Sequence, residues 1–163
     1  MAKAGPASVE FRNVSMRYGA VTAVDNINFI IEAGKLVTLL GPSGCGKTTT
    51  LRMIAGLEIA SEGQILIGGK DVTKLSAADR DVSMVFQSYA LFPHMSVLDN
   101  AAYGPTVKGL GKDEAKQMAL EKLALVGLKG FENRYPHELS GGQQQRVAVA
   151  RALVLEPQVL LFD

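Results

Sequence analysis

The sequence predicts an α/β fold, in which strands and helices alternate along the first part of the chain. Nearly continuous apolar runs stand at Leu36–Leu40, Val82–Phe86 and Val159–Phe162, and such runs are typical of strands that are buried on both faces. A helical stretch, Thr48–Ala55, follows the first run and ends at Gly56, a residue suited to a helix C-terminus. Interleaved helices and strands of this kind favour an α/β architecture with parallel central strands.

Three shorter strands are expected around these elements. Residues 9–11 and 27–31 alternate apolar and polar side chains, which predicts an antiparallel or edge layer. Residues 64–67 predict one more strand, which ends at a pair of glycines. The predicted sheet is therefore mixed, with an antiparallel layer contributed by the N-terminal residues.

The later part of the chain has a helical character. Apolar residues repeat at helical spacing over 114–126, and a second helix is expected over 143–155, ended by Pro157. No strand pattern occurs between these helices and the apolar run at 82–86. We therefore expect an α/β core over residues 1–87, a helical subdomain over 88–155 and a final strand over 156–163.

The composition excludes several classes of function. With 163 residues, 47% of them apolar and 20% charged, the chain has the composition of a folded domain rather than a disordered one. A net charge of +1 provides no basic field for nucleic acid. The single cysteine, Cys45, suits a reducing compartment, and no apolar run approaches the ~18 residues that cross a bilayer. We therefore expect a cytoplasmic protein that does not span a membrane by itself.

Gly41–Thr48 has the pattern of a phosphate-binding loop. It satisfies G-x-x-x-x-G-K-[ST] between a predicted strand and a predicted helix, where backbone N–H groups and the helix N-terminus favour phosphate. Lys47 supplies a positive charge for the β and γ phosphates, and the Thr48 hydroxyl is placed to bind Mg²⁺. An ordinary glycine-rich turn is the alternative. A dinucleotide site of the NAD type is excluded because Thr49 stands where that motif needs its third glycine.

Asp163 is the predicted second half of this site. It ends the apolar run at Val159–Phe162, and a carboxylate at the C-terminal tip of a buried strand can hold a metal, usually through water. An acid that simply caps a turn is the alternative interpretation.

Leu139–Arg146 opens a helix with a second glycine-rich turn. Ser140 and Gln143 have the spacing of a capping box, so a structural cap is the simplest interpretation. Gly141 and Gly142 are not needed for a cap, they lower helix stability, and they leave bare N–H groups exposed. A second anion site is therefore expected, and since one nucleotide has one triphosphate, it indicates a partner molecule.

Taken together, these motifs resemble those of the nucleotide-binding domain of ABC transporters, over almost the whole chain. Gly41–Thr48 is similar to the Walker A motif of the family, Val159–Asp163 to the start of Walker B, and Leu139–Gln143 to the LSGGQ signature. Gln87 matches the Q-loop glutamine, and Tyr18 the aromatic A-loop residue that stacks on adenine. The resemblance implies a P-loop NTPase core with a mixed sheet and a helical insert, of which the C-terminal part is missing.

The resemblance also implies roles for individual residues. Lys47 and Gln87 are the expected catalytic residues, and Thr48, Gln87 and Asp163 the expected ligands of Mg²⁺. The expected ATP-binding residues are Tyr18, Gly41, Pro42, Ser43, Gly44, Cys45, Gly46, Lys47, Thr48 and Thr49. The residues expected to meet the partner's ATP are Leu139, Ser140, Gly141, Gly142 and Gln143.

The implied function is that of an ATPase subunit that powers solute import. Residues 84–95 are similar to those of ATPase subunits of importers for polyamines, iron, inorganic anions and sugars, with polyamine-type importers as the nearest resemblance. Two such domains, identical or closely related, close head to tail around ATP, and hydrolysis reopens them. The implied partners are this second domain, transmembrane permease subunits and, indirectly, a periplasmic or extracellular solute-binding protein, with no nucleic acid. The implied location is the inner face of the cell membrane. The stretch Tyr89–Pro93 is either the docking surface for the permease or a loop packed into the helical core.

The chain also departs from the family pattern. The catalytic glutamate, D-loop and switch histidine of the family all follow the Walker B aspartate, and His94 and His137 precede it. We therefore expect a fragment that binds Mg-ATP weakly, hydrolyses almost none and tends to aggregate through an unpaired strand. Cys45 lies in the phosphate loop, so its alkylation is expected to block nucleotide binding.

Two alternatives to the transport ATPase remain open. A noncatalytic binding module would dock on membrane subunits without turnover. A DNA-repair ATPase shares the motifs, but it carries a long coiled coil for which too few residues separate Gln87 from Ser140.

Overall fold

The computed structural model describes residues 5–163 as two compact units. One unit contains the described residues up to Val82 together with Asp163, and the other contains Ser83–Phe162. The division falls a few residues before the expected boundary at 87, and it places the final strand with the helices. The two units are described separately below.

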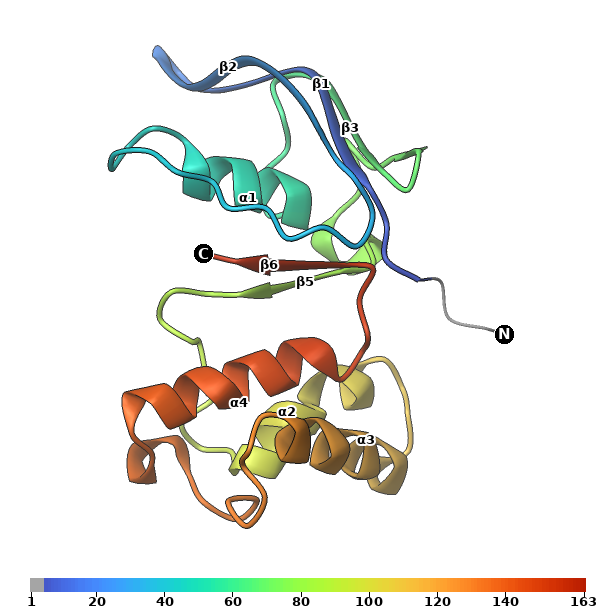
Figure 1. Ribbon diagram of the computed structural model, residues 1–163, viewed down its shortest axis with the longest axis vertical. Coiled ribbons are helices and arrows are strands. Elements are labelled where there is room, and N and C mark those ends of the chain that lie inside the picture. Colours follow the sequence, from blue (N-terminus) through green and yellow to red (C-terminus); the bar gives the residue numbers. More distant parts are fainter. Residues whose placement is uncertain (1–4) are drawn as a thin grey trace. The chain divides into compact units, whose positions relative to one another are not determined.

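An antiparallel sheet forms the first unit. Strand β1 (Val9–Tyr18) pairs antiparallel with β2 (Val21–Ile31) on one side and with β3 (Glu62–Ile67) on the other, and β3 pairs with β4 (Lys70–Asp71). Figure 1 shows the first three strands side by side, with helix α1 (Lys47–Ala55) beside them. The expected antiparallel N-terminal layer is confirmed, and its strands are longer than the apolar pattern predicted.

The buried face of β1 anchors this sheet. Val9 and Phe11 are buried, as are Val14 and Met16, and the alternation changes phase between the two pairs, where the pairing with β2 shifts register. The ring of Phe11 stacks on Phe29 of β2 with centroids 4.5 Å apart. Burial of these side chains fixes the register of the sheet, because a slip of one residue would expose them.

A buried arginine holds the end of α1. The helix ends at Gly56, which has a left-handed backbone with φ of 75°. Arg80 is 5% exposed, and its guanidinium donates to the carbonyl oxygens of Met53 at 2.6 Å and Ile54 at 3.0 Å. Burial lowers the pKa of Arg80, but the carbonyl dipoles at the helix C-terminus favour its positive charge. A short 3-10 turn, η1 (Ala77–Asp79), leads the chain to this arginine.

The predicted strand at Leu36–Leu40 is wrong. The structure assigns no strand to these residues, and Leu36 and Leu40 are 94% and 89% exposed. A strand exists only where a neighbour completes its ladder of hydrogen bonds, and no described strand pairs with this stretch. Residues 36–40 therefore have the apolar pattern of a buried strand, but within residues 5–163 no neighbouring strand pairs with them.

A two-stranded sheet and three helices make up the second unit. Strand β5 (Val82–Val85) pairs with β6 (Val159–Phe162), and Figure 1 shows their arrows running in the same direction. Helices α2 (Val97–Val107), α3 (Lys112–Leu125) and α4 (Gly141–Leu153) follow in order, with a 3-10 turn, η2 (Pro136–Glu138), before α4. The expected parallel strands and helical insert are confirmed.

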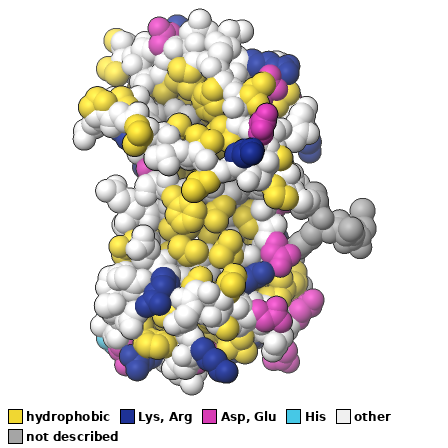
Figure 2. All heavy atoms as spheres, viewed as in Figure 1, with side chains coloured by type: hydrophobic (Ala, Val, Ile, Leu, Met, Phe, Trp, Pro, Cys, Tyr) yellow, Lys and Arg dark blue, Asp and Glu magenta, His cyan; other side chains and the backbone are white. Residues whose placement is uncertain are grey.

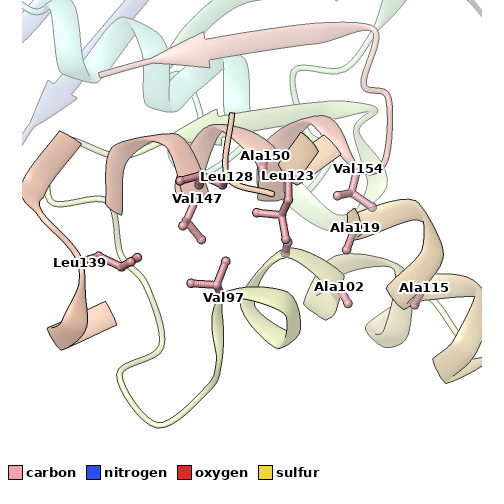
Figure 3. Packing of buried hydrophobic residues seen from close by; sticks show 11 residues of the cluster. Val97, Ala102, Ala115, Ala119, Leu123, Leu128, Leu139, Val147, Ala150 and Val154 are labelled. Atoms are coloured by element: carbon pink, nitrogen blue, oxygen red, sulfur yellow. The ribbon is translucent and has the colours of Figure 1, made fainter. Parts of the chain in front are cut away.

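The helices pack around a small apolar core, and their side chains point toward one another in Figure 3. Small residues dominate it, which lets the helices approach closely. The buried members are Val97, Ala101, Ala102, Ala115, Ala119, Leu123, Leu128, Leu139, Val147, Ala150 and Val154.

Helix α2 was not predicted from the sequence. Gly104 and Pro105 lie in its last turn, and both residues disfavour a helix interior. Its start does carry a signal, because the Ser96 hydroxyl accepts from the Asp99 N–H at 3.1 Å, as an N-cap does. The tertiary packing of Val97, Ala101 and Ala102 therefore overrides the propensities at the helix end.

The surface carries mixed charge. Figure 2 shows lysine, arginine, aspartate and glutamate side chains scattered together over the face it displays. Among residues 5–163, no helix is both long and apolar enough to cross a membrane.

Candidate functional site

The loop before α1 is curled, and two of its glycines have left-handed backbones. The φ angles of Gly44 and Gly46 are 79° and 88°, and the Cys45 N–H donates to the carbonyl of Pro42 at 3.3 Å. A Cβ atom on Gly46 would lie 2.7 Å from the carbonyl oxygen of Ala23 in β2. The sheet therefore requires glycine at this position.

The side chain of Lys47 folds back into this loop. Its Nζ donates to the carbonyl oxygens of Gly41 and Pro42, each at 2.7 Å, and lies 3.4 Å from Sγ of Cys45. An ammonium group has three N–H donors, and the third faces the thiol of Cys45, a weak acceptor that an anion would readily replace. The loop is thus wrapped around a fixed positive charge.

The N-terminus of α1 adds to the anion-binding character of the loop. Gly46 is the N-cap residue and provides no side-chain cap, and Thr50 is the first residue whose N–H bonds back to Gly46, at 2.8 Å. The N–H groups at the start of a helix lack intrahelical partners and carry partial positive charge. These groups are suited to phosphate oxygens.

Thr48 and Asp163 meet although they are far apart in the sequence. The Thr48 hydroxyl donates to Oδ1 of Asp163 at 2.8 Å, within the first compact unit. Both are hard oxygen donors, and Mg²⁺ is usually held by one or two such protein groups together with substrate phosphates and water. Within residues 5–163, no cluster of three or more His, Cys, Asp or Glu side chains could hold a metal ion by itself. The donor set fits a magnesium ion that arrives with phosphate.

Tyr18 lies at the end of β1, next to α1. It is 45% exposed, and Glu58, which follows α1, raises the pKa of its hydroxyl chiefly by accepting its hydrogen bond. A smaller opposing contribution comes from the Thr49 hydroxyl, which bonds to the phenol oxygen. Tyr18 therefore lies close to Thr49 of α1 and to Glu58, which follows that helix. Glu58 was not expected from the sequence, because nothing local distinguishes it from other surface acids.

The second glycine-rich turn belongs to the other compact unit. Ser140 and Gln143 form the expected capping box, with Ser140 N–H donating to Oε1 of Gln143 at 2.9 Å. Leu139 is buried in the helical core and anchors the turn. A Cβ on Gly141 or Gly142 would meet nothing within 4 Å, so no described neighbour requires glycine at either position.

The structure groups the predicted site residues into two sets. Tyr18, residues 41–49 and Asp163 lie in the first unit, whereas Gln87 and Leu139–Gln143 lie in the second. Gln87 is exposed and follows β5 by two residues. His94 and His137 are exposed, and each lies near one aromatic ring, Phe92 and Tyr135 respectively.

Two structurally important residues of the helical unit were not predicted from the sequence, because their side chains form hydrogen bonds with backbone groups. Asn100 is fully buried, and its side-chain amide bonds to both the N–H and the carbonyl of Phe92. Arg151 donates to the carbonyls of Tyr89 and Ala90. Backbone partners leave no pattern of residue types, so sequence reasoning has no signal for them.

Comparison with known proteins agrees with this geometry. The family model described as ABC transporter matches residues 24–163. The chain is 67% identical over 163 residues to an "Fe(3+) ions import ATP-binding protein FbpC 1" of Rhizobium meliloti (strain 1021), covering 100% of this chain and 46% of that protein. It is 70% identical over 158 residues to the FbpC protein of Agrobacterium fabrum (strain C58 / ATCC 33970), covering 97% of this chain and 45% of the relative. The chain thus spans about half the length of the curated relatives it matches.

Solved structures give the same result for the fold. The ATP-binding cassette MJ0796 in a post-hydrolysis state, bound to ADP and Pi, matches with a TM-score of 0.84 and 35% identity, covering 95% of this chain and 73% of that one. A dimeric structure of the same cassette matches with a TM-score of 0.85, 35% identity and the same coverage. The ATP-binding cassette fold is confirmed.

The relatives correct one expectation about the cargo. Both curated relatives are named for Fe(3+) ions, so the polyamine type expected from the sequence has no support among them. The match over residues 24–163 includes the phosphate loop, the signature turn and the final aspartate. The chain therefore belongs to the ABC transporter family.

Proposed function

We propose that this chain is the ATP-binding part of a subunit that drives import of Fe³⁺ ions through the membrane. The observation that carries the proposal is the loop curled around Lys47, with the Thr48–Asp163 pair in the same unit. The names of the relatives support the importer role and the iron cargo.

In this proposal the first unit binds the nucleotide. The amides of the loop and of the first turn of α1, with the ammonium of Lys47, hold the phosphates of ATP, and the exposed ring of Tyr18 stacks on adenine. Thr48 and Asp163 would hold Mg²⁺. The ion, when bound, neutralises charge on the transferring phosphate.

The second unit acts on the ATP of a partner subunit. Ser140, Gly141 and Gly142 meet the γ-phosphate across a head-to-tail dimer, and the open space beside both glycines is compatible with this contact. The solved cassette that matches this fold is described as dimeric. ATP binding closes the pair and hydrolysis reopens it, and the partner is a second copy or a closely related subunit.

The loop after Gln87 connects this cycle to the membrane. Ala90, Pro93 and His94 are exposed, while Tyr89 and Leu91 pack against a small cluster formed by Val85, Ala148 and Ala152. One side of the loop is therefore packed and the other is exposed. We assign it to contact with permease subunits on the inner face of the membrane, which in turn receive iron from a solute-binding protein. A protein with this role is an ATPase associated with the membrane through its partners.

The nucleotide part of the proposal is tested by substitution at Lys47. Lys47→Ala is expected to weaken Mg-ATP binding at least about tenfold, because it removes charge-assisted bonds to phosphate. Binding of a fluorescent ATP analogue measures this effect, and Lys70→Ala, at an exposed lysine of β4, is the matched control. Equal affinity in the Lys47 and Lys70 variants would refute the assignment of the site.

The cargo is tested separately, by uptake in cells whose copy of the gene is deleted and then restored. Restoration of the gene is expected to restore accumulation of labelled Fe³⁺, and the Lys47→Ala form is expected not to. Restored uptake of a polyamine without restored iron uptake would contradict the assignment of the cargo.

A further inference from the structure

Two consecutive residues after Gln87 have strained backbones. Tyr89 and Ala90 have φ angles of 61° and 48°, in the left-handed region that residues with a Cβ avoid. Neither residue is glycine, so surrounding groups must hold this turn in place. Backbone outliers of this kind are concentrated where a protein needs a defined, poised segment.

The group that holds the turn is the guanidinium of Arg151, from the last turn of α4. It donates to the carbonyl of Ala90 at 2.8 Å and to the carbonyl of Tyr89 at 2.9 Å. Within residues 5–163, Arg151 forms no ion pair, and burial lowers its pKa. A partly buried cation without an acid partner is costly unless hydrogen bonds satisfy it, and these two carbonyls do so.

The residue that follows the turn is fixed from two helices. Arg151 lies 5.7 Å from the ring of Phe92, which packs 4.6 Å from the ring of Tyr103 in α2. The buried amide of Asn100, also in α2, bonds to the N–H and the carbonyl of Phe92 at 2.8 and 3.0 Å. Contacts from α2 and α4 therefore hold the loop in place. Arg151 provides the contact from α4, the helix that begins at the signature turn.

We infer that Arg151 is a positioning residue that couples the signature helix to the loop proposed to meet the membrane subunits. Helix α4 begins at the turn assigned to the partner's ATP, and Arg151 in its last turn bonds to the strained residues that follow Gln87. A movement of α4 on ATP binding therefore moves Tyr89 and Ala90 with it. This inference rests on the proposed function, because it needs the loop to be a docking surface.

A rescue experiment separates this role from general packing. Arg151→Gln removes the guanidinium fork, and adding Ala90→Gly removes part of the need for it, because glycine adopts φ near 48° without strain while Tyr89 keeps its φ of 61°. Arg151→Lys keeps the charge but cannot donate in parallel to two carbonyls, and it serves if the glutamine variant folds poorly. Arg146→Gln is the matched control, since Arg146 lies on the same helix, is exposed, and makes a single bond of 3.4 Å to the carbonyl of Val126.

Two readouts are measured on the full-length protein carrying this chain. The first is hydrogen exchange at the Tyr89 amide, which donates to Phe86 at 2.9 Å and so reports the turn. The second is the stimulation of ATP hydrolysis by the membrane subunits in a reconstituted transporter. Arg151→Gln is expected to speed the exchange at least about tenfold and to lower the stimulation by a similar factor, with Arg151→Lys in between and Arg146→Gln unchanged.

Adding Ala90→Gly to Arg151→Gln is expected to return both readouts toward the wild type. The inference is overturned if Arg151→Gln leaves the Tyr89 exchange unchanged, or if the glycine fails to restore the stimulation. A wild-type protein that the membrane subunits do not stimulate would refute the proposed function instead. The exchange measurement would then still decide whether Arg151 holds the turn.

Discussion

Two glycine-rich turns open helices in this protein, and they use glycine for different reasons. In the phosphate loop the chain itself requires it, because Gly46 has a left-handed backbone and a Cβ there would collide with the carbonyl of Ala23. In the signature turn, Gly141 and Gly142 have ordinary helical positions with open space beside them. The first turn is shaped by its own fold, whereas the second leaves room for a molecule that approaches from outside. Four predictions test this difference.

The largest effect is expected for Gly46→Ala. The left-handed backbone costs about 1–2 kcal/mol, and crowding against Ala23 and Val24 adds about 1–3 kcal/mol, so the free energy of unfolding falls by roughly 3 kcal/mol. ATP binding is lost with it. Denaturant unfolding measures the change, with Gly44→Ala as control. Gly44 also has a positive φ but no neighbour within 4 Å, so only the backbone cost of about 1–2 kcal/mol is expected. Equal destabilisation of the two variants would show that crowding against Ala23 does not require glycine at position 46.

The double variant Gly141→Ala, Gly142→Ala is expected to keep the stability of the monomer and to lose affinity in the ATP-dependent dimer. Alanine favours the helix by up to about 1 kcal/mol per position, so the monomer keeps or gains stability. Dimerisation in ATP is expected to weaken on the order of 100-fold, because two methyl groups occupy the space left for the partner's phosphate and block charge-assisted bonds. Analytical ultracentrifugation with Mg-ATP measures it. A stable monomer with unchanged dimer affinity would show that the signature glycines do not face a partner.

Alkylation of Cys45 probes the phosphate loop without changing its glycines. The thiol is exposed, and its Sγ lies 3.4 Å from Nζ of Lys47, so a maleimide adduct stands where the ammonium meets phosphate. ATP affinity is expected to fall at least about tenfold through lost charge-assisted bonds. Cys45→Ser, treated with the same reagent, should bind as the untreated protein does. Unchanged affinity after complete labelling would mean that phosphate lies elsewhere.

The smallest effect is expected for Ser140→Ala, which removes the cap of α4. Loss of an N-cap costs about 1 kcal/mol of unfolding free energy. Ser96→Ala, at the cap of α2, is the matched control and should cost a similar amount. If Ser140 also meets the partner's ATP, only its variant weakens the ATP-dependent dimer. Identical dimer affinity in both variants would reduce Ser140 to a structural cap.

Much of the nucleotide site could be predicted from the sequence, because its chemistry is local. The loop 41–48 and the start of α4 each place glycines, a cation or a capping pair within a few residues of one another, so spacing alone predicts their geometry. Asp163 was expected at this site because it ends an apolar run, but its direct bond to Thr48, at 2.8 Å, depends on the fold because the two residues are distant in the chain.

Features that depend on residues distant in the sequence were determined by the tertiary structure. The apolar pattern at Leu36–Leu40 states what these residues prefer, but a strand forms only where another strand supplies hydrogen bonds, and these residues have none among the described strands. Arg80 and Arg151 look like surface cations in the sequence, yet they bind carbonyls 26 and 62 residues away. Every residue has a backbone carbonyl, so no sequence pattern distinguishes the ones that a buried guanidinium will find. The sequence by itself therefore determined the local motifs, whereas tertiary packing determined which backbone carbonyls the buried arginines bind.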